Sequence, residues 1–287
     1  MKVLVTGAAG MLGRAIVLRG MADCEVIGIS RGDADLAVPA AVENIVVQHQ
    51  PDWIVHCAAW TNVDGAESNQ KDAMVGNATI TKNLVNACEK QKSGLTMIST
   101  DYVFDGSTDS GYVEGETRDP VNYYGRTKAC GEEFVEQMKA PWQIVRTSWL
   151  FGDGNTNFVK TMRRLLGERE TLRVVEDQKG SPTYVDDLAA VVEFLVCARK
   201  QGIFHGTNSG VTTWCGLAQE VARCLGTEAD RIVGCPSSEY PTPAKRPANS
   251  VLLSRRLEDA GCPERPAWQD AVARYVSRLE AGDVLCP

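Results

Sequence analysis

Tyr124 and Lys128 form a Tyr-x-x-x-Lys motif near the middle of the chain. Four residues make about one helical turn, so on a helix the phenol and the ammonium lie on the same face. A lysine placed there can lower the pKa of the tyrosine, which can then exchange a proton with a carbonyl or an alcohol near neutral pH. Because tyrosine and lysine also occur at this spacing by chance in many helices, the motif needs support from the rest of the sequence.

A glycine-rich segment follows the first apolar stretch and provides that support. Residues 6–13 read TGAAGMLG and place Gly7, Gly10 and Gly13 in a G-x-x-G-x-x-G pattern. Between a strand and a helix, the first glycine permits a tight turn, the second lets the backbone approach a pyrophosphate, and the third allows close packing of helix on strand. An ordinary glycine-rich turn is the alternative, but the position favours dinucleotide binding. The spacing resembles that of the extended short-chain dehydrogenase/reductase superfamily.

The end of the second predicted strand indicates which dinucleotide is preferred. An acidic residue there binds the 2′-hydroxyl of NAD, whereas a basic residue suits the 2′-phosphate of NADP. The strand ends in Ile29-Ser30-Arg31, with Asp33 and Asp35 close by. Arg31 could also be a solvated loop residue. We expect NADPH as the cofactor, with NADH as the alternative.

The overall composition argues against several other classes of function. The 287 residues carry a formal net charge of −7, whereas general nucleic-acid binders and membrane-surface proteins need a positive face. The ten cysteines contain no C-x-x-C pair and the three histidines have no metal-ligand spacing, so we expect no metal site. No apolar run is long enough to span a bilayer and no signal peptide is visible, so we expect a cytoplasmic protein with free thiols.

The first half of the chain alternates strands with helices. Strands are predicted at 2–6, 25–29, 53–57, 96–100 and 143–148, and helices at about 12–19, 40–48, 72–91 and around Tyr124. Strands separated by helices predict βαβ units with right-handed crossovers. The fold class is therefore α/β, a doubly wound parallel sheet of the Rossmann type that binds ligands at the carboxyl ends of its strands.

After residue 150 this alternation is less regular. Helices are predicted at 157–167, 186–200, 217–225 and 267–280, extended segments at 172–175 and 203–205, and a proline-rich stretch lies at 236–247. We expect a Rossmann-type NAD(P)-binding domain made of residues 1–150 and 171–205. Residues 151–170 and 206–287 are expected to form a smaller C-terminal substrate-binding cap.

Ser99 and Thr100 end the strand that precedes the Tyr124 helix. A hydroxyl at this strand end can hydrogen-bond the substrate oxygen that Tyr124 protonates, and so polarise it. Both residues could instead be β-prone residues that lead into a loop. The order of the glycine motif, the Thr100 hydroxyl and the Tyr124–Lys128 pair along the chain favours the catalytic interpretation.

Six longer strings resemble one family within that superfamily, the dTDP-4-dehydrorhamnose reductases. They are STDYVFDG at 99–106, DPVNYYGRTK at 119–128, RTSW at 146–149, NFVK at 157–160, DQKGSPT at 177–183 and KRPANS at 245–250. The resemblance runs nearly from end to end and is far more specific than the glycine pattern alone. It implies an NADPH-preferring oxidoreductase that reduces the 4-keto group of dTDP-4-dehydro-L-rhamnose to dTDP-L-rhamnose, with Tyr124 as proton donor assisted by Lys128 and Thr100.

The resemblance also implies residues for the cofactor and for the substrate. Ala58, Ala59 and Thr61 are small residues at a strand end, where close packing is an equal alternative, and Asn77 could be a satisfied polar residue in mid-helix. The expected cofactor-binding residues are Gly7, Gly10, Met11, Leu12, Gly13, Arg31, Asp35, Leu36, Ala58, Ala59, Thr61, Asn77, Tyr124 and Lys128. The expected substrate-binding residues are Asp101, Tyr102, Trp149, Asn157, Lys160 and Arg246, with Arg246 as the first candidate for the diphosphate and Lys160 as the second.

Two alternative functions share this architecture. Dehydratases of sugar nucleotides resemble one another in having a glutamate after Thr-Asp, where this chain has Tyr102, and epimerases retain a tightly bound NAD. The regulatory subunit of methionine adenosyltransferase resembles the reductases and acts as a non-catalytic binding partner.

Some reductases have a glutamate at the position of Ala15 that contributes to a magnesium-bound dimer contact. Because this chain has alanine there, we expect no such metal. The expected partner is a small-molecule sugar nucleotide, and the protein is expected to be a monomer or a homodimer.

Overall fold

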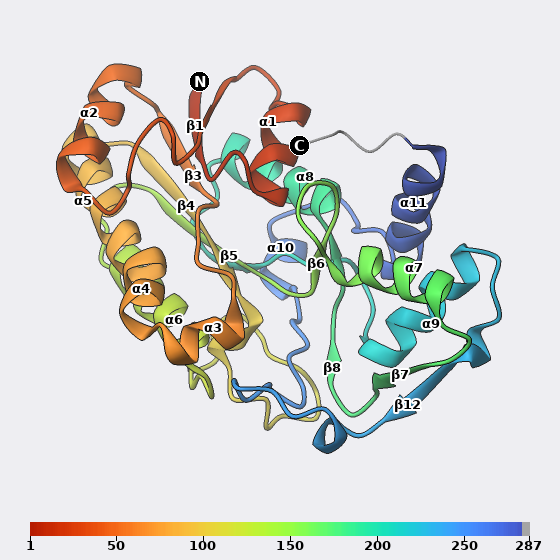
Figure 1. Ribbon diagram of the computed structural model, residues 1–287. Coiled ribbons are helices and arrows are strands. Elements are labelled where there is room, and N and C mark those ends of the chain that lie inside the picture. The colour runs from red at the N-terminus through yellow and green to blue at the C-terminus, as the bar shows by residue number, and fades with distance from the viewer. Residues whose placement is uncertain (283–287) are drawn as a thin grey trace.

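A six-stranded parallel sheet forms the centre of the computed structural model, which describes residues 1–282 (Figure 1). The strand order is β2-β1-β3-β4-β5-β10, so the chain starts in the middle, builds one edge and then returns to build the other. This reversal between β1 and β3 is the topological switch point at which doubly wound sheets bind their ligands. The predicted fold class is confirmed. The strands are β1 (Lys2–Thr6), β2 (Glu25–Ile29), β3 (Trp53–His56), β4 (Gly94–Thr100), β5 (Trp142–Thr147) and β10 (Gly202–His205).

Helices cover both faces of this sheet, and its central strands are therefore mostly buried and rich in apolar residues. Val3 and Val5 point to the face covered by α1 (Met11–Arg19) and α8 (Val185–Cys197), and Leu4 points to the opposite face. Alternate residues of a strand project to opposite sides, so one short strand contributes to two cores. The opposite face is covered by α2 (Pro39–His49), α5 (Ile80–Gln91) and α6 (Tyr123–Glu136).

The helix predicted at 72–91 is interrupted near its beginning. It consists of α4 (Gln70–Met74), a π-helical turn (Val75–Thr79) and α5. Asn77, in the π turn, exchanges hydrogen bonds with the backbone of Trp60. The wider turn, of a kind often found near functional sites, brings this part of the helix to the loop that follows β3. A further short helix, α3 (Val63–Ser68), was not predicted.

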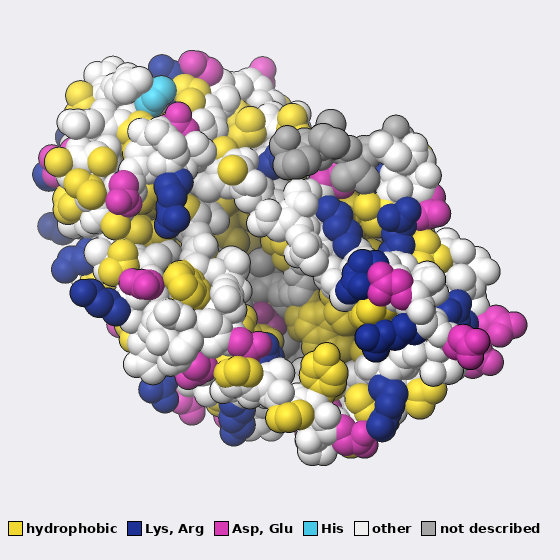
Figure 2. Space-filling view, in the orientation of Figure 1, with side chains coloured by type: hydrophobic (Ala, Val, Ile, Leu, Met, Phe, Trp, Pro, Cys, Tyr) yellow, Lys and Arg dark blue, Asp and Glu magenta, His cyan; other side chains and the backbone are white. Residues whose placement is uncertain are grey.

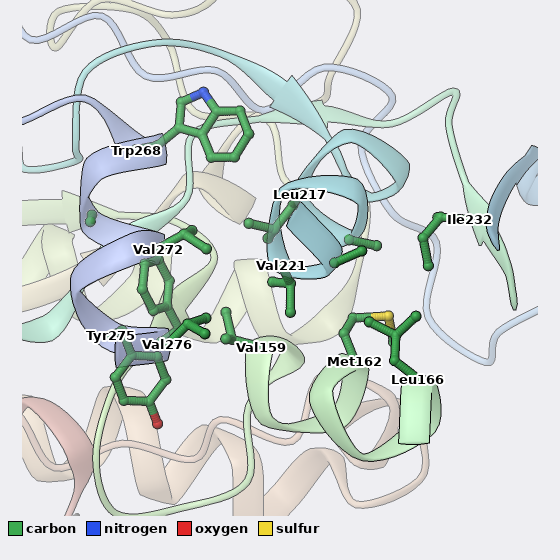
Figure 3. Packing of buried hydrophobic residues seen from close by; sticks show 14 of the residues in the cluster. Val159, Met162, Leu166, Leu217, Val221, Ile232, Trp268, Val272, Tyr275 and Val276 are labelled. Atoms are coloured by element: carbon green, nitrogen blue, oxygen red, sulfur yellow. The ribbon is translucent and has the colours of Figure 1, made fainter. Parts of the chain in front are cut away.

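Three helices pack together in the second part of the molecule (Figure 1). They are α7 (Phe158–Glu168), α9 (Trp214–Cys224) and α11 (Trp268–Ala281). Figure 3 shows Val159 and Met162 of α7 and Val221 of α9 facing the same core as Tyr275 of α11. Short strand pairs complete this part: β6 (Leu150–Phe151) with β9 (Thr183–Tyr184), β7 (Leu172–Val175) with β12 (Ile232–Cys235), and β8 (Lys179–Gly180) with β11 (Thr212–Thr213).

The strand pairings and helix contacts follow the predicted domain boundaries at some segments and cross them at others. Residues 171–205 were assigned to the Rossmann-type domain, and α8 and β10 do belong to its sheet and helical cover. Strand β7, however, pairs with β12 in the second part, and α10 (Arg255–Asp259) packs against β10 of the first part. The division into a cofactor domain and a cap therefore stays a prediction. Residues 283–287 of the predicted cap lie outside the described residues.

The surface is hollowed between the two parts, with hydrophobic side chains on one wall (Figure 2). No helix within residues 1–282 is both long and apolar enough to cross a membrane. Over the same residues, no group of three or more His, Cys, Asp or Glu side chains is arranged to hold a metal ion.

Candidate active site

A cavity of about 1000 Å³ opens at the carboxyl ends of the central strands. It lies where the switch point of the sheet predicts a ligand site. It brings together most of the residues predicted from the sequence, whereas Asn77, Asn157, Lys160 and Arg246 are not on its lining. The predicted residues on the lining are Gly7, Gly10, Met11, Leu12, Gly13, Arg31, Asp35, Leu36, Ala58, Ala59, Thr61, Thr100, Asp101, Tyr102, Tyr124, Lys128 and Trp149.

The glycine-rich turn has no room for side chains at two of its positions. Gly7 has a φ of +69°, and a Cβ there would lie 2.6 Å from the backbone nitrogen of Ala58. A Cβ at Gly13 would lie 2.3 Å from the carbonyl oxygen of Gly7. No side chain caps the N-terminus of α1, whose preceding residue is Gly10. A narrow backbone turn followed by an uncapped helix N-terminus fits a pyrophosphate group, so these residues fit a dinucleotide.

Arg31 lies at the end of the cavity formed by the β2 loop. The two acidic residues nearby are engaged in local turns. Asp33 accepts hydrogen bonds from the backbone nitrogen and hydroxyl of Ser30 at 2.8 and 2.7 Å, and these bonds lower its pKa. Asp35 accepts one from the backbone nitrogen of Ala37 at 3.0 Å. The exposed guanidinium of Arg31 therefore has the better position for a cofactor phosphate.

Helix α6 presents Tyr124 and Lys128 to the end of strand β4. Asn122 caps the helix by accepting a hydrogen bond from the backbone nitrogen of Gly125 at 2.8 Å. The Tyr124 phenol has the Thr100 hydroxyl as a hydrogen-bonding neighbour. The Lys128 ammonium donates to the carbonyl of Ile98 at 2.7 Å. The acid, the hydroxyl and the ammonium predicted from the sequence therefore lie together.

Burial controls the acidity of both helix residues. It raises the pKa of Tyr124 to about 12, and the Thr100 hydrogen bond opposes this only in part. It lowers the pKa of Lys128 to about 8. The shift of Tyr124 is opposite to the one that the Tyr-x-x-x-Lys spacing predicts, because spacing gives the position of a charge and not the cost of removing a phenolate from water.

Asp101 is a buried carboxyl group on the same wall. Its Oδ1 accepts a hydrogen bond from the Thr100 hydroxyl at 3.0 Å, whereas its Oδ2 has no hydrogen-bond partner among the described residues. Burial raises the pKa of Asp101 to about 7. This acid can therefore be protonated or ionised near neutral pH.

Asn77 supports the cavity from behind. Its Oδ1 accepts from the Trp60 backbone nitrogen at 2.9 Å, and its Nδ2 donates to the Trp60 carbonyl and to the Thr127 hydroxyl. The side chain is fully buried and satisfied by these partners. It therefore joins the loop after β3, which contains Ala58 and Ala59, to helix α6.

Aromatic rings from the second part of the molecule form another wall. Trp149 and Trp214 stack with ring centroids 3.6 Å apart, and both line the cavity. Gly180 lies against the Trp149 indole, because a Cβ there would come within 2.4 Å of it. Trp149 also has a φ of +49°, a conformation that bulky residues rarely adopt, so packing must hold it in place. Trp214 was not predicted from the sequence, because it precedes a predicted helix without any recognisable motif. Four further lining residues were also not predicted: Thr147, Ser148, Asn155 and Thr156.

The three remaining predicted substrate residues are not on the lining of the cavity. Asn157 donates to the Gly152 carbonyl at 2.8 Å and caps α7, and Lys160 donates to the Gly154 carbonyl at 3.0 Å. Both therefore hold the 152–156 loop. Arg246 forms an ion pair with Asp64 and lies beside Tyr102.

The chain is similar to known proteins over almost its whole length. Residues 1–281 match the family model described as RmlD substrate binding domain. A dTDP-4-dehydrorhamnose reductase from Streptomyces griseus is 41% identical over 283 residues, covering 96% of this chain and 93% of the relative. A dTDP-4-keto-6-deoxy-D-glucose reductase from Streptomyces niveus is 39% identical over 283 residues, covering 98% of both proteins.

Two solved structures are similar over the same length. The dTDP-4-dehydrorhamnose reductase from Clostridium acetobutylicum has a TM-score of 0.93 at 38% identity, covering 98% of this chain and 100% of that one. The enzyme of the same name from Bacillus anthracis, solved in complex with NADP, has a TM-score of 0.93 at 34% identity, covering 96% and 99%.

Proposed function

The chain belongs to the dTDP-4-dehydrorhamnose reductase family of NAD(P)H-dependent oxidoreductases, and from this premise we propose that it reduces the 4-keto group of dTDP-4-dehydro-L-rhamnose to dTDP-L-rhamnose. We further propose NADPH as the preferred cofactor and Tyr124 as the proton donor, assisted by Lys128 and Thr100. The observation that carries this proposal is the meeting of these three side chains in the cavity that also contains the glycine-rich turn.

In this proposal the proton that reaches the substrate starts on the Tyr124 phenol. With a pKa of about 12, the phenol keeps its proton throughout the neutral range and is available as an acid. The Thr100 hydroxyl, next to the phenol, hydrogen-bonds the same carbonyl oxygen and polarises it. When bound, NADPH supplies the hydride that reduces the carbonyl carbon.

The cofactor residues act by position and charge. The turn at Gly7 and the N-terminus of α1 hold the pyrophosphate through backbone N–H groups. Arg31 binds the 2′-phosphate of the adenosine ribose, and the Lys128 ammonium binds the hydroxyls of the nicotinamide ribose. The NADP bound to the Bacillus anthracis relative supports NADPH as the cofactor.

Some of the proposed substrate residues line the cavity, whereas others hold the segments next to it. Asp101, Tyr102 and Trp149 line the cavity and are proposed to contact the sugar. Arg246 is proposed to bind the diphosphate from its position beside Tyr102. Asn157 and Lys160 are proposed to act indirectly, through the loop that they hold.

A second keto-sugar is also a candidate substrate. The Streptomyces niveus relative carries the name of a dTDP-4-keto-6-deoxy-D-glucose reductase and matches this chain as fully as the rhamnose enzymes do. The two ketoses differ in the stereochemistry of the ring, which the cavity wall around Trp149 would have to distinguish.

The test is to measure oxidation of NADPH and of NADH with each keto-sugar nucleotide, beside a reaction without substrate. The proposal expects faster turnover with dTDP-4-dehydro-L-rhamnose and with NADPH. Faster turnover of the glucose-derived ketose would support the second candidate. Failure to reduce either ketose, by a folded protein that still binds NADPH, would contradict both and favour a non-catalytic binding role.

A further inference from the structure

Helix α6 and strand β4 meet through three matched contacts, of which the proposed function uses two. The Tyr124 phenol neighbours the Thr100 hydroxyl, and the Lys128 ammonium donates to the Ile98 carbonyl. One helical turn further on, Glu132 accepts a hydrogen bond from the Ser99 hydroxyl at 2.5 Å. Three helix residues at intervals of four therefore face three consecutive strand residues.

Glu132 is an ionised carboxylate in the interior of the protein. Its side chain has no exposed surface. Arg146 donates to it from Nη2 at 2.6 Å and from Nε at 2.9 Å, and Arg118 donates from Nη1 at 3.0 Å. Burial raises the pKa of Glu132, but the two guanidinium groups and Ser99 together bring it below its usual value. A buried charge this well compensated stays negative through the neutral range.

Lys128 needs a negative neighbour because its own surroundings disfavour its charge. Burial lowers its pKa, and Glu132 and Cys57 are the groups that oppose this effect. The Cys57 thiol, however, has a pKa raised to about 12, so it is neutral at the pH at which Lys128 titrates. On β3, His56 has a pKa lowered to about 3 and is also neutral there.

The remaining charged and titratable groups around this helix do not replace Glu132. Tyr124 keeps its proton well above neutral pH. Arg146 on β5 and Arg118 in the loop before α6 are positively charged and bind Glu132 directly. Asp101, whose pKa is about 7, lies beside Thr100 but is not among the groups that shift the pKa of Lys128. Within residues 1–282, Glu132 is therefore the carboxylate whose charge opposes the loss of the Lys128 proton.

We propose that Glu132 is a positioning residue of this site, whose carboxylate keeps the Lys128 ammonium charged and aligned on strand β4. This inference rests on the proposed role of Lys128 in cofactor binding. It assigns a function to a buried carboxylate that touches neither the cavity nor a ligand. Loss of the carboxylate would let Lys128 lose its proton at lower pH, and the site would then bind the cofactor less well.

The test is the affinity of the protein for NADPH as a function of pH in Glu132→Gln. The affinity should decline on the basic side when Lys128 loses its proton, and the midpoint in Glu132→Gln should lie about one pH unit below that of the unmodified protein. At a pH on this limb, the variant should bind about tenfold more weakly. The matched control is Glu136→Gln, which removes the second carboxylate bound to Arg118 and should leave the midpoint in place.

A comparison in a Lys128→Met background separates a local effect from a general loss of structure. There, Glu132→Gln should no longer change the pH dependence. An unchanged midpoint in folded Glu132→Gln, or an equal change in the Lys128→Met background, would overturn the inference. Because binding is measured rather than turnover, the result does not depend on which keto-sugar the protein reduces.

Glu132→Gln leaves Arg146 buried without its partner, and an unpaired buried charge strongly destabilises a folded protein. If thermal melting shows that this variant does not fold, Glu132→Gln combined with Arg146→Met removes the buried pair as a unit and is better tolerated. Arg146 is not among the groups that shift the pKa of Lys128, so the same lowered midpoint is expected. A midpoint at the original pH in the double variant would equally overturn the inference.

Discussion

Arg246 and Asp64 form a two-pronged ion pair that joins the proline-rich segment to helix α3. The two contacts measure 2.5 Å from Nη1 to Oδ1 and 2.8 Å from Nη2 to Oδ2. The backbone nitrogen of Ala244 donates to the same carboxylate at 3.1 Å. The arginine proposed to bind the diphosphate is therefore already engaged by a carboxylate of the other part of the molecule, and two roles for it can be distinguished.

The two roles predict different effects of Arg246→Gln and Asp64→Asn. If Arg246 binds the diphosphate, Arg246→Gln should raise the KM of the sugar nucleotide at least about tenfold, the worth of one charge-assisted contact. Asp64→Asn should then change KM far less, because it leaves the guanidinium in place. Steady-state kinetics with both variants provide the measurement. Equal effects would assign Arg246 to holding the two parts together.

Tyr124→Phe removes the proposed proton donor and little else. Turnover should fall by roughly 10²–10⁴-fold, the usual contribution of a positioned acid, while NADPH affinity stays nearly unchanged. The control is Tyr123→Phe, which removes the neighbouring phenol on the same helix and should keep most of the activity. Turnover of Tyr124→Phe close to that of the unmodified protein would exclude the phenol from the mechanism.

Local sequence patterns were sufficient to predict the fold and one side of the site. Tyr124, Lys128 and Thr100 could be placed because helical periodicity and strand ends follow from nearby residues. The glycines at 7 and 13 were predictable for the same reason, since a turn between strand and helix restricts which residues fit. The alternation of strands and helices likewise predicted the doubly wound sheet.

Contacts between distant segments could not be predicted in this way. The pairing of Arg246 with Asp64 joins residues 182 positions apart, and neither residue type indicates its partner. From the sequence, Asn77 could be a cofactor contact or a satisfied polar residue, and its bonds to Trp60 and Thr127 could not be foreseen because they join separate segments of the chain. The direction of the Tyr124 pKa shift depends on burial, which is a property of the whole packed molecule.

Arg31→Asp tests the proposed cofactor preference. A carboxylate in place of the guanidinium should repel the 2′-phosphate of NADPH and accept a hydrogen bond from the 2′-hydroxyl of NADH. The ratio of kcat/KM for NADPH to that for NADH should therefore fall by at least about tenfold. Asp33→Asn is the control, because Asp33 binds Ser30 and should not affect this ratio. An unchanged ratio in Arg31→Asp would mean that residue 31 does not contact the cofactor phosphate.

Asp101→Asn should change how the stability of the protein depends on pH. In the unfolded chain the carboxyl ionises near its usual pKa of 3.8, whereas in the folded protein it does so near 7. Between these values the folded state retains a proton that the unfolded state has lost. The free energy of unfolding therefore falls as the pH rises from about 4 to 7, and it stays lower above pH 7. Asparagine cannot ionise, so the melting temperature of Asp101→Asn, relative to the unmodified protein, should be higher at pH 8 than at pH 5. The difference should correspond to about 1–3 kcal/mol. If the difference in melting temperature between Asp101→Asn and the unmodified protein is the same at pH 5 and at pH 8, Asp101 is ionised in the folded protein at both pH values.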